Sequence, residues 1–126
     1  MRTSKRSIAI TAFLAVAVLT AAPGYTDMVD ITATVTADNH YALYHGLENG
    51  DSLAFVGRNE VNKPGDPGQY NWSLPETFNF SVQSGEYLYL AGWGDDTSAE
   101  GVLGQFDLST SIISETILTG DQGWEV

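Results

Sequence analysis

The sequence predicts an all-β protein, a single antiparallel β-sandwich of jelly-roll type that follows an N-terminal signal peptide. Beyond residue 26, apolar and polar residues alternate in short segments, and no segment shows a helical period. Turn-forming residues separate these segments at intervals of roughly 8 to 12 residues, which is typical of sandwiches. The 126 residues are 43% hydrophobic and 17% charged, a composition and length suited to one domain with a packed core.

Residues 1–26 are typical of a secretory signal peptide. Arg2, Lys5 and Arg6 give the segment a positive start, and residues 7–22 that follow carry no charge. The apolar run within them is shorter than the roughly 20 residues of a membrane-spanning helix. The pattern therefore indicates export rather than a membrane span.

Cleavage is expected between Ala21 and Thr26, where small residues surround Pro23 and Gly24. The mature protein is then one domain over residues 27–126, located outside the cell, in a periplasm or on the cell surface. An uncleaved N-terminal anchor is the alternative interpretation of the same segment.

Charge and cysteine content exclude several classes of function. The predicted mature chain keeps two basic residues, Arg58 and Lys63, against 16 acidic ones, a net charge of −14. Such a chain repels nucleic acid and anionic lipid surfaces and could attract divalent cations, although acidity alone also serves solubility. The sequence has no Cys, which removes disulfides, thiolate metal sites and a cysteine nucleophile.

Alternation places the first predicted strands of the domain. Along residues 29–37 the odd positions are Val, Ile or Ala and the even positions are Asp or Thr, which indicates one buried and one wet face. Residues 40–46 and 52–57 form the next two strands. Asn49-Gly50 between them predicts a hairpin, because both residues tolerate a positive φ.

The second half of the domain follows a loop over 58–75 that is rich in Pro and Gly. In the strand 77–82 the apolar residues at alternate positions, Phe78 to Val82, are expected to face the core. Residues 86–92 (EYLYLAG) are a strong central-strand candidate. The last clear strands are 102–108 and 111–118, and residues 123–126 start a further one. The sequence predicts about seven strands, whereas a jelly roll has about eight. Either the last strand is short or the gene product is truncated.

Three segments in this order resemble galactose-binding-like jelly-roll modules. They are 36–44 (TADNHYALY), 72–82 (WSLPETFNFSV) and 87–106 (YLYLAGWGDDTSAEGVLGQF). The resemblance, over about residues 30–108, implies a secreted sandwich of the kind that often binds glycans and often holds one structural calcium ion. The chain is also similar to secreted domains of bacterial surface proteins with a PEP-CTERM-type sorting tail, a tail that is absent here. It departs from the modules at residues 43–46 (LYHG), where they carry Leu-Tyr-x-Asn-Gly.

A structural calcium ion is the cofactor that the loops predict. Asp38 and Asn39 end one strand, and Asp95 and Asp96 lie in a loop that the resembling fold places nearby. Calcium needs several oxygen ligands from such loops, so Asp38, Asp95 and Asp96 are the candidate metal ligands. The alternative is turn chemistry, in which Asp and Asn bond their own backbone.

Carbohydrate is the leading ligand class because sugars stack on exposed aromatic rings. The candidate ligand-binding residues are Tyr70, Trp72, Tyr87, Tyr89 and Trp93. Tyr70 and Trp72 lie in the Pro-rich loop, whereas the other three share one face of a strand. If Leu88 and Leu90 point into the core, these three rings form an exposed platform. If the rings point inward, they are simply core.

The sequence contains no arrangement of residues that is typical of a catalytic site. His40 and His45 are five apart on a strand and face opposite sides, and no Gly-x-Ser-x-Gly motif is present. We therefore expect a secreted, non-catalytic carbohydrate-recognition module. The alternative function is a structural cell-surface or matrix domain without a small-molecule ligand.

Overall fold

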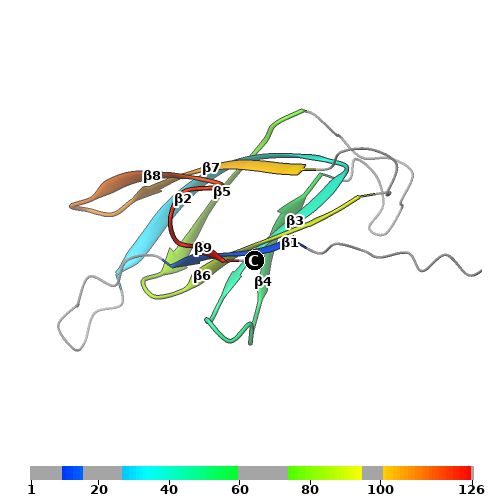
Figure 1. Ribbon diagram of the computed structural model, residues 1–126. Helices are drawn as coiled ribbons and strands as arrows, with labels where there is room; N and C mark the ends of the chain where they lie inside the picture. Colours follow the sequence, from blue (N-terminus) through cyan, green and yellow to red (C-terminus); the bar gives the residue numbers. More distant parts are fainter. Residues whose placement is uncertain (1–9, 16–26, 60–73, 95–100, 126) are drawn as a thin grey trace, which may run out of the picture.

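The computed structural model describes residues 10–15, 27–59, 74–94 and 101–125, and over these residues it contains β-strands and turns but no helix (Figure 1). Two antiparallel sheets form two layers. The first contains, in spatial order, β4 (Ala54–Arg58), β3 (His40–Gly46), β6 (Tyr87–Trp93), β1 (Ile10–Ala15) and β9 (Trp124–Glu125). The second contains β5 (Glu76–Gln83), β2 (Met28–Asp38), β7 (Gly101–Ser109) and β8 (Ser114–Leu118). The all-β, antiparallel two-sheet prediction is confirmed.

Every strand predicted over residues 29–118 is present, with bounds that differ by three residues at most. The hairpin predicted at Asn49-Gly50 joins β3 to β4. In it, the amide of Gly50 donates to the carbonyl of Leu47 at 2.9 Å, and Gly50 has a φ of 75°. That positive φ is the reason a glycine suits the position.

The sequence does not predict β1, which lies inside the expected signal peptide. The six residues of β1 pair antiparallel with β6, from Ile10 opposite Gly92 to Ala15 opposite Tyr87. The strand also pairs with β9 on its other side. The cleaved signal peptide stays a prediction, since the structure describes only the folded, uncut chain. In the described residues, no helix has the length and apolar character needed to cross a bilayer.

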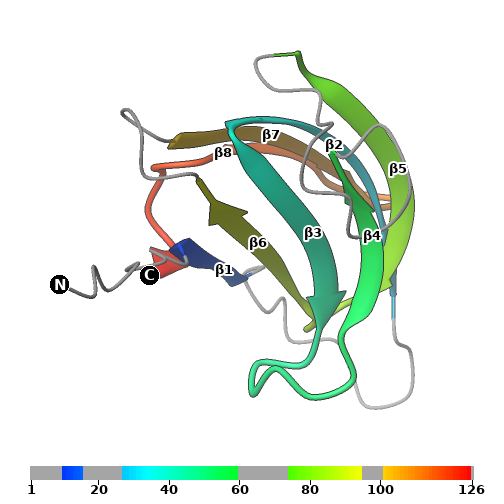
Figure 2. The same cartoon turned by 90° about the vertical axis from the view of Figure 1, so that its right-hand side faces the viewer.

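The core lies between the two sheets, which curve over each other in Figure 2. Alternate residues of β2 point into it, as predicted from the odd positions of 29–37. The buried apolar cluster is Val29, Ile31, Ala33, Val35, Ala37, Tyr41, Leu43, Val82, Leu88, Leu90, Phe106 and Leu108. Phe78 and Phe80 of β5 pack against it from the expected side of their strand.

One buried amide ties the end of β4 to the start of β3. The Asn59 side chain is fully buried. Its Oδ1 accepts from the amide of Tyr41 at 3.1 Å, and its Nδ2 donates to the carbonyl of Asn39 at 2.7 Å. The Asn59 amide thus satisfies one buried backbone donor and one buried backbone acceptor, and such groups are costly to leave unpaired away from water.

The hydroxyl of Tyr41 joins the two sheets at the same edge of the sandwich. It donates to Oε2 of Glu76 on β5 at 2.8 Å, and the ring meets the ring of Phe78 edge-on at 6.3 Å between centroids. Burial, followed by the hydrogen bond and the charge of Glu76, raises the pKa of Tyr41 well above its ordinary value. The folded state therefore favours the neutral phenol.

Replacing a buried leucine tests the core. Leu90→Ala removes a fully buried side chain and is expected to lower the free energy of unfolding by about 2 to 5 kcal/mol. The matched control is Leu103→Ala, because Leu103 is 69% exposed and its truncation should change stability by about 0.5 kcal/mol at most. Urea unfolding measures both, and equal effects would contradict the described core.

The raised pKa of Tyr41 predicts a loss of stability in strong base. Its contribution is fully present below the ordinary tyrosine pKa of about 10 and is lost as pH rises above that value. The melting temperature of the unaltered protein should therefore fall more steeply with rising pH above pH 10 than the melting temperature of Tyr41→Phe. Between pH 7 and 9 the two proteins should respond alike, and parallel curves above pH 10 would contradict the assignment.

Candidate functional site

The side chains of β6 divide between the core and the outer face of the five-stranded sheet. Leu88 and Leu90 belong to the buried cluster, so the alternate residues Tyr87, Tyr89 and Trp93 lie on the outer face. Of the two arrangements open from the sequence, the structure therefore has the leucines inside.

Strand register extends this outer face into a row of aromatic side chains. Tyr89 of β6 lies opposite Tyr44 of β3, which lies opposite Phe55 of β4. Directly opposed residues share one face of a sheet. The row therefore runs across three strands in the order Phe55–Tyr44–Tyr89. The rings of Tyr44 and Phe55 meet edge-to-face at 5.5 Å between ring centroids.

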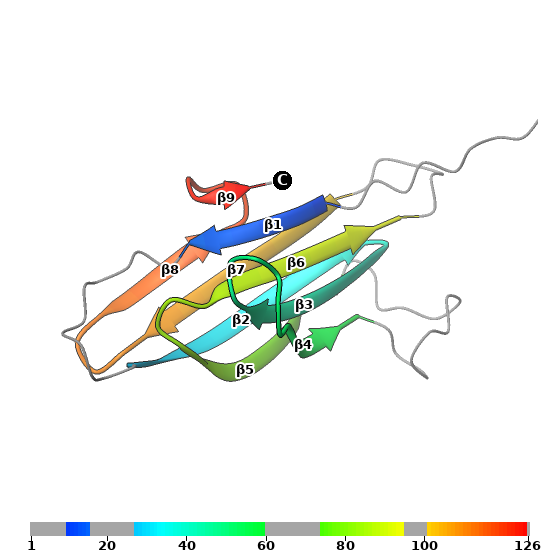
Figure 3. The same ribbon diagram turned by 90° about the horizontal axis from the view of Figure 1, so that it is seen from below.

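Tyr89 lies beneath the β3–β4 turn and is only 5% exposed. Its hydroxyl donates to the carbonyl of Leu47 and accepts from the amide of Gly50 at 3.2 Å. Figure 3 shows this turn lying over β6. The hydroxyl of Tyr89 thus holds the turn in place, and its ring offers little surface to a ligand. The expectation that the three rings form an exposed platform is therefore wrong for Tyr89.

Trp93 and Tyr87 occupy the two ends of the same strand. Trp93 is 37% exposed and stacks on His40 of β3, with 5.3 Å between ring centroids and 13° between ring planes. Tyr87 is half-buried and lies opposite Gly46. The other two aromatic candidates, Tyr70 and Trp72, lie outside the described residues.

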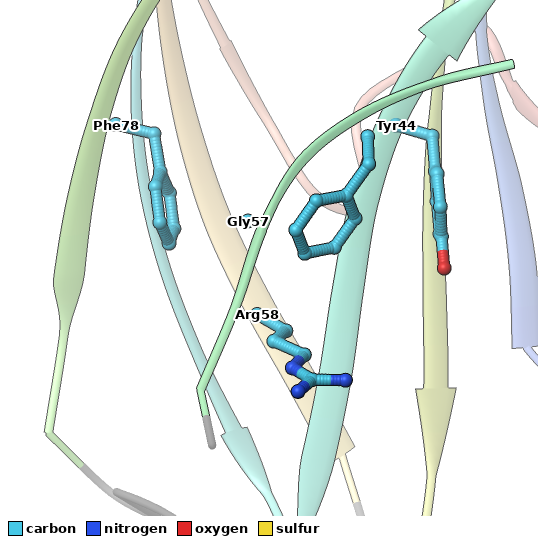
Figure 4. A pocket seen from close by; sticks show the side chains of 5 residues that line it. Tyr44, Gly57, Arg58 and Phe78 are labelled. Atoms are coloured by element: carbon cyan, nitrogen blue, oxygen red, sulfur yellow. The ribbon is translucent and has the colours of Figure 1, made fainter. Parts of the chain in front are cut away.

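A hollow of about 590 Å³ opens beside the exposed end of the aromatic row (Figure 4). It is lined by Tyr44, Phe55, Gly57, Arg58 and Phe78. Arg58 lies opposite Ala42 in the register and therefore shares the outer face with Tyr44 and Phe55. The lining combines apolar rings with one guanidinium group.

Gly57 shapes this hollow by letting β5 approach β4. A Cβ atom at position 57 would lie 2.2 Å from the ring of Phe78, which no side chain tolerates. The ring of Phe78 therefore rests against the backbone of β4 and closes one side of the hollow. Any larger residue at position 57 would push that ring away.

Three residues that line the hollow were not among the predicted ligand-binding residues: Tyr44, Phe55 and Arg58. Alternation along β3 places Tyr41 and Leu43 inside and hence Tyr44 outside, a signal that was available in the sequence. Phe55 and Arg58 depend on a register shift between Leu43 and Tyr44. Residue alternation does not reveal such a bulge.

The outer face of the other sheet is polar, and its side chains bond one another. The hydroxyl of Thr32 donates to Asn79 at 2.9 Å, and that of Ser81 donates to Asp30 at 2.6 Å. On β7, hydrogen bonds from Thr116 and Gln105 lower the pKa of Asp107. A hollow of about 280 Å³ on this face is lined largely by these paired polar groups. The aromatic face is therefore the better candidate for ligand contact.

The predicted calcium ligands are only partly described. Asp38 ends β2 opposite Gly101, and His40 lies opposite Trp93. The corner at Asp38 therefore lies between the two described ends of the segment that contains Asp95 and Asp96, which themselves lie outside the described residues. Within the described residues, no three His, Asp or Glu side chains gather closely enough to hold a metal ion.

The two histidines lie on opposite faces of β3, as predicted. His40 stacks on Trp93 outside, whereas His45 stacks on Phe80 of the facing sheet at 5.9 Å between centroids. Nδ1 of His45 also lies 3.3 Å from Oε2 of Glu86. The imidazoles therefore have no common ligand position.

The chain matches no known protein-family model, no curated protein sequence and no solved structure. The case for function therefore depends on the geometry described above.

Removing the hydroxyl of Tyr89 tests its hold on the β3–β4 turn. Tyr89→Phe keeps the ring but loses both hydrogen bonds to the turn, and hydrogen bonds of this kind contribute about 0.5 to 1.5 kcal/mol each. The amide of Gly50 also donates to the carbonyl of Leu47, so its exchange reports opening of the whole turn. It should exchange with solvent deuterium at least about tenfold faster in Tyr89→Phe than in the unaltered protein. Tyr44→Phe is the control, and unchanged exchange in Tyr89→Phe would contradict this role.

Proposed function

We propose that the protein is a secreted, non-catalytic carbohydrate-recognition module of jelly-roll type, and that a sugar binds in the hollow beside Tyr44 and Phe55. The observation that carries the proposal is the pair of outward-facing rings at a concave place on the sheet. Sugar rings present apolar C–H faces that pack on such aromatic surfaces.

The polar part of the hollow suits the hydroxyl groups of a sugar. Arg58 carries five N–H donors in a planar arrangement, and the phenol of Tyr44 can both donate and accept. Phe55 is 57% exposed, so its ring meets a ligand without any rearrangement of the core. A few polar groups beside exposed rings are the usual composition of a ligand site.

The acidic charge of the domain favours a neutral glycan. The predicted mature chain carries a net charge of −14, with Arg58 as one of two cations. At low ionic strength this charge repels an acidic polymer over distances of about 10 Å or more. A structural calcium ion at Asp38, Asp95 and Asp96 is part of the proposal and would order a loop rather than take part in a reaction.

Retention of the protein on insoluble polysaccharides tests the proposed function. The folded chain should bind one neutral polymer of a panel, and Phe55→Ala should weaken that binding at least about tenfold, which corresponds to about 1.4 kcal/mol. Ile112→Ala is the matched control, because Ile112 is an 82% exposed apolar residue next to β8, in the other sheet. Parallel runs with calcium and with chelator test the metal ion.

Two outcomes contradict the proposal. Equal retention of Phe55→Ala, Tyr44→Ala and the unaltered protein would place the sugar elsewhere. Absence of retention from a folded sample on every polymer would favour the alternative, a structural surface domain without a sugar ligand.

A further inference from the structure

The strand β6 has the residues of a central strand. Its sequence, YLYLAGW, contains no charged residue, and Leu88, Tyr89, Leu90 and Gly92 are all buried. Edge strands usually carry charges that prevent unwanted pairing. The edge strands β4, β5 and β8 follow this rule with Arg58, Glu76 and Glu115. The sequence of β6 therefore suits a neighbour on each side.

One neighbour of β6 is β3, and the other is β1. Six consecutive residue pairs, from Ile10–Gly92 to Ala15–Tyr87, cover almost the whole length of β6. Yet β1 lies in the segment 1–26 that the sequence predicts to be removed on export. Cleavage between Ala21 and Thr26 would separate β1 from the domain and leave this side of β6 unpaired.

The strand β9 lies on the far side of β1 from β6. In the described residues β9 pairs with β1 alone, but Trp124 is held independently of it. The indole Nε1 donates to the carbonyl of Leu118 at 2.8 Å, and the ring packs on Phe106 at 5.4 Å between centroids. Since strands lie about 4.8 Å apart, the space between β6 and β9 takes one strand (Figure 3).

We propose that this position is a strand-acceptor site, which after leader removal takes an uncharged apolar strand of another polypeptide, antiparallel to β6. The resident strand, ITAFLA, defines the chemistry of the occupant: about six residues, largely apolar and without charge. Addition of a strand to a sheet edge is an established mode of peptide recognition, in which the backbone supplies the hydrogen bonds.

The negative charge of the mature domain favours a strand from a different polypeptide over one from a second copy of this chain. Pairing of two β6 edges would bring two mature domains of net charge −14 into contact, and like charges at that distance repel. An uncharged strand meets no such barrier. The site is also separate from the proposed sugar site, because it lies along the edge of β6 that faces away from β3 and β4, the strands of Tyr44 and Phe55.

Cleavage of the folded, full-length chain tests the proposal. Residues 20–25 are replaced by a protease recognition sequence, and the cut protein is unfolded and refolded with an excess of fluorescent peptide covering residues 7–17. Anisotropy should report saturable binding to the cut protein and at least about a hundredfold weaker binding to the uncut protein, whose own β1 competes at high effective concentration.

A proline variant of the peptide, Ala12→Pro, is the control for strand pairing. Proline lacks the amide that extends a ladder, so this peptide should not bind. Equal binding of both peptides, equal binding to cut and uncut protein, or no binding to a folded cut protein would each overturn the proposal. So would exported protein whose N-terminal sequence still includes Ile10–Ala15.

Disulfide trapping reports the register. The sequence has no cysteine, so one cysteine in the peptide and one in the chain can be introduced without other thiols that would compete for the disulfide. Peptide Thr11→Cys should form a disulfide with chain Ala91→Cys, because these residues are opposed in the β1–β6 pairing, and should not do so with Tyr87→Cys. Equal trapping at both positions would overturn the antiparallel site. Neither readout involves sugar, so failure here leaves the proposed function standing.

Discussion

The burial of Leu88 and Leu90 between the two sheets determines what the remaining surfaces can do. With these side chains in the core, strand alternation places every aromatic residue of β6 on the outer face. Because Tyr44 lies opposite Tyr89 and Phe55 lies opposite Tyr44, these two residues of β3 and β4 also lie on the outer face. The aromatic row is therefore a consequence of core packing. A shift of the strand register by one residue would have turned these rings into the core.

The two outer faces of the sandwich differ in what they leave available. On the sheet of β5, β2, β7 and β8, hydroxyl, amide and carboxylate groups bond each other across strands, for example Thr34 to Thr77 at 3.1 Å. A ligand would have to compete with these bonds. On the opposite sheet Phe55 exposes a ring that has no hydrogen bonds to lose, so a ligand that stacks there displaces only water.

The strands were predictable from the sequence, whereas the outer surfaces were predictable only in part, for physical reasons. Alternation in residues such as Val29 to Ala37 reports burial directly, so β2 was predictable almost to the residue. The cover over Tyr89 depends on how the turn at Gly50 folds back over the sheet, and the hollow depends on a bulge beside Leu43. Both are tertiary features that no local pattern encodes. The short strand Ile10–Ala15 was missed because an apolar run in a leader and one in a buried strand have the same composition.

That shared composition links the leader to the proposed acceptor site. The position beside β6 holds a strand without charged residues, and an export signal requires an uncharged apolar run for a different reason. The N-terminal segment meets both requirements, so it can pair with β6 while it remains attached. The proposed cleavage would leave the backbone groups of β6 that pair with β1 without those partners. Under the proposal, another strand would supply these backbone partners and restore the neighbour of β6 in the five-stranded sheet.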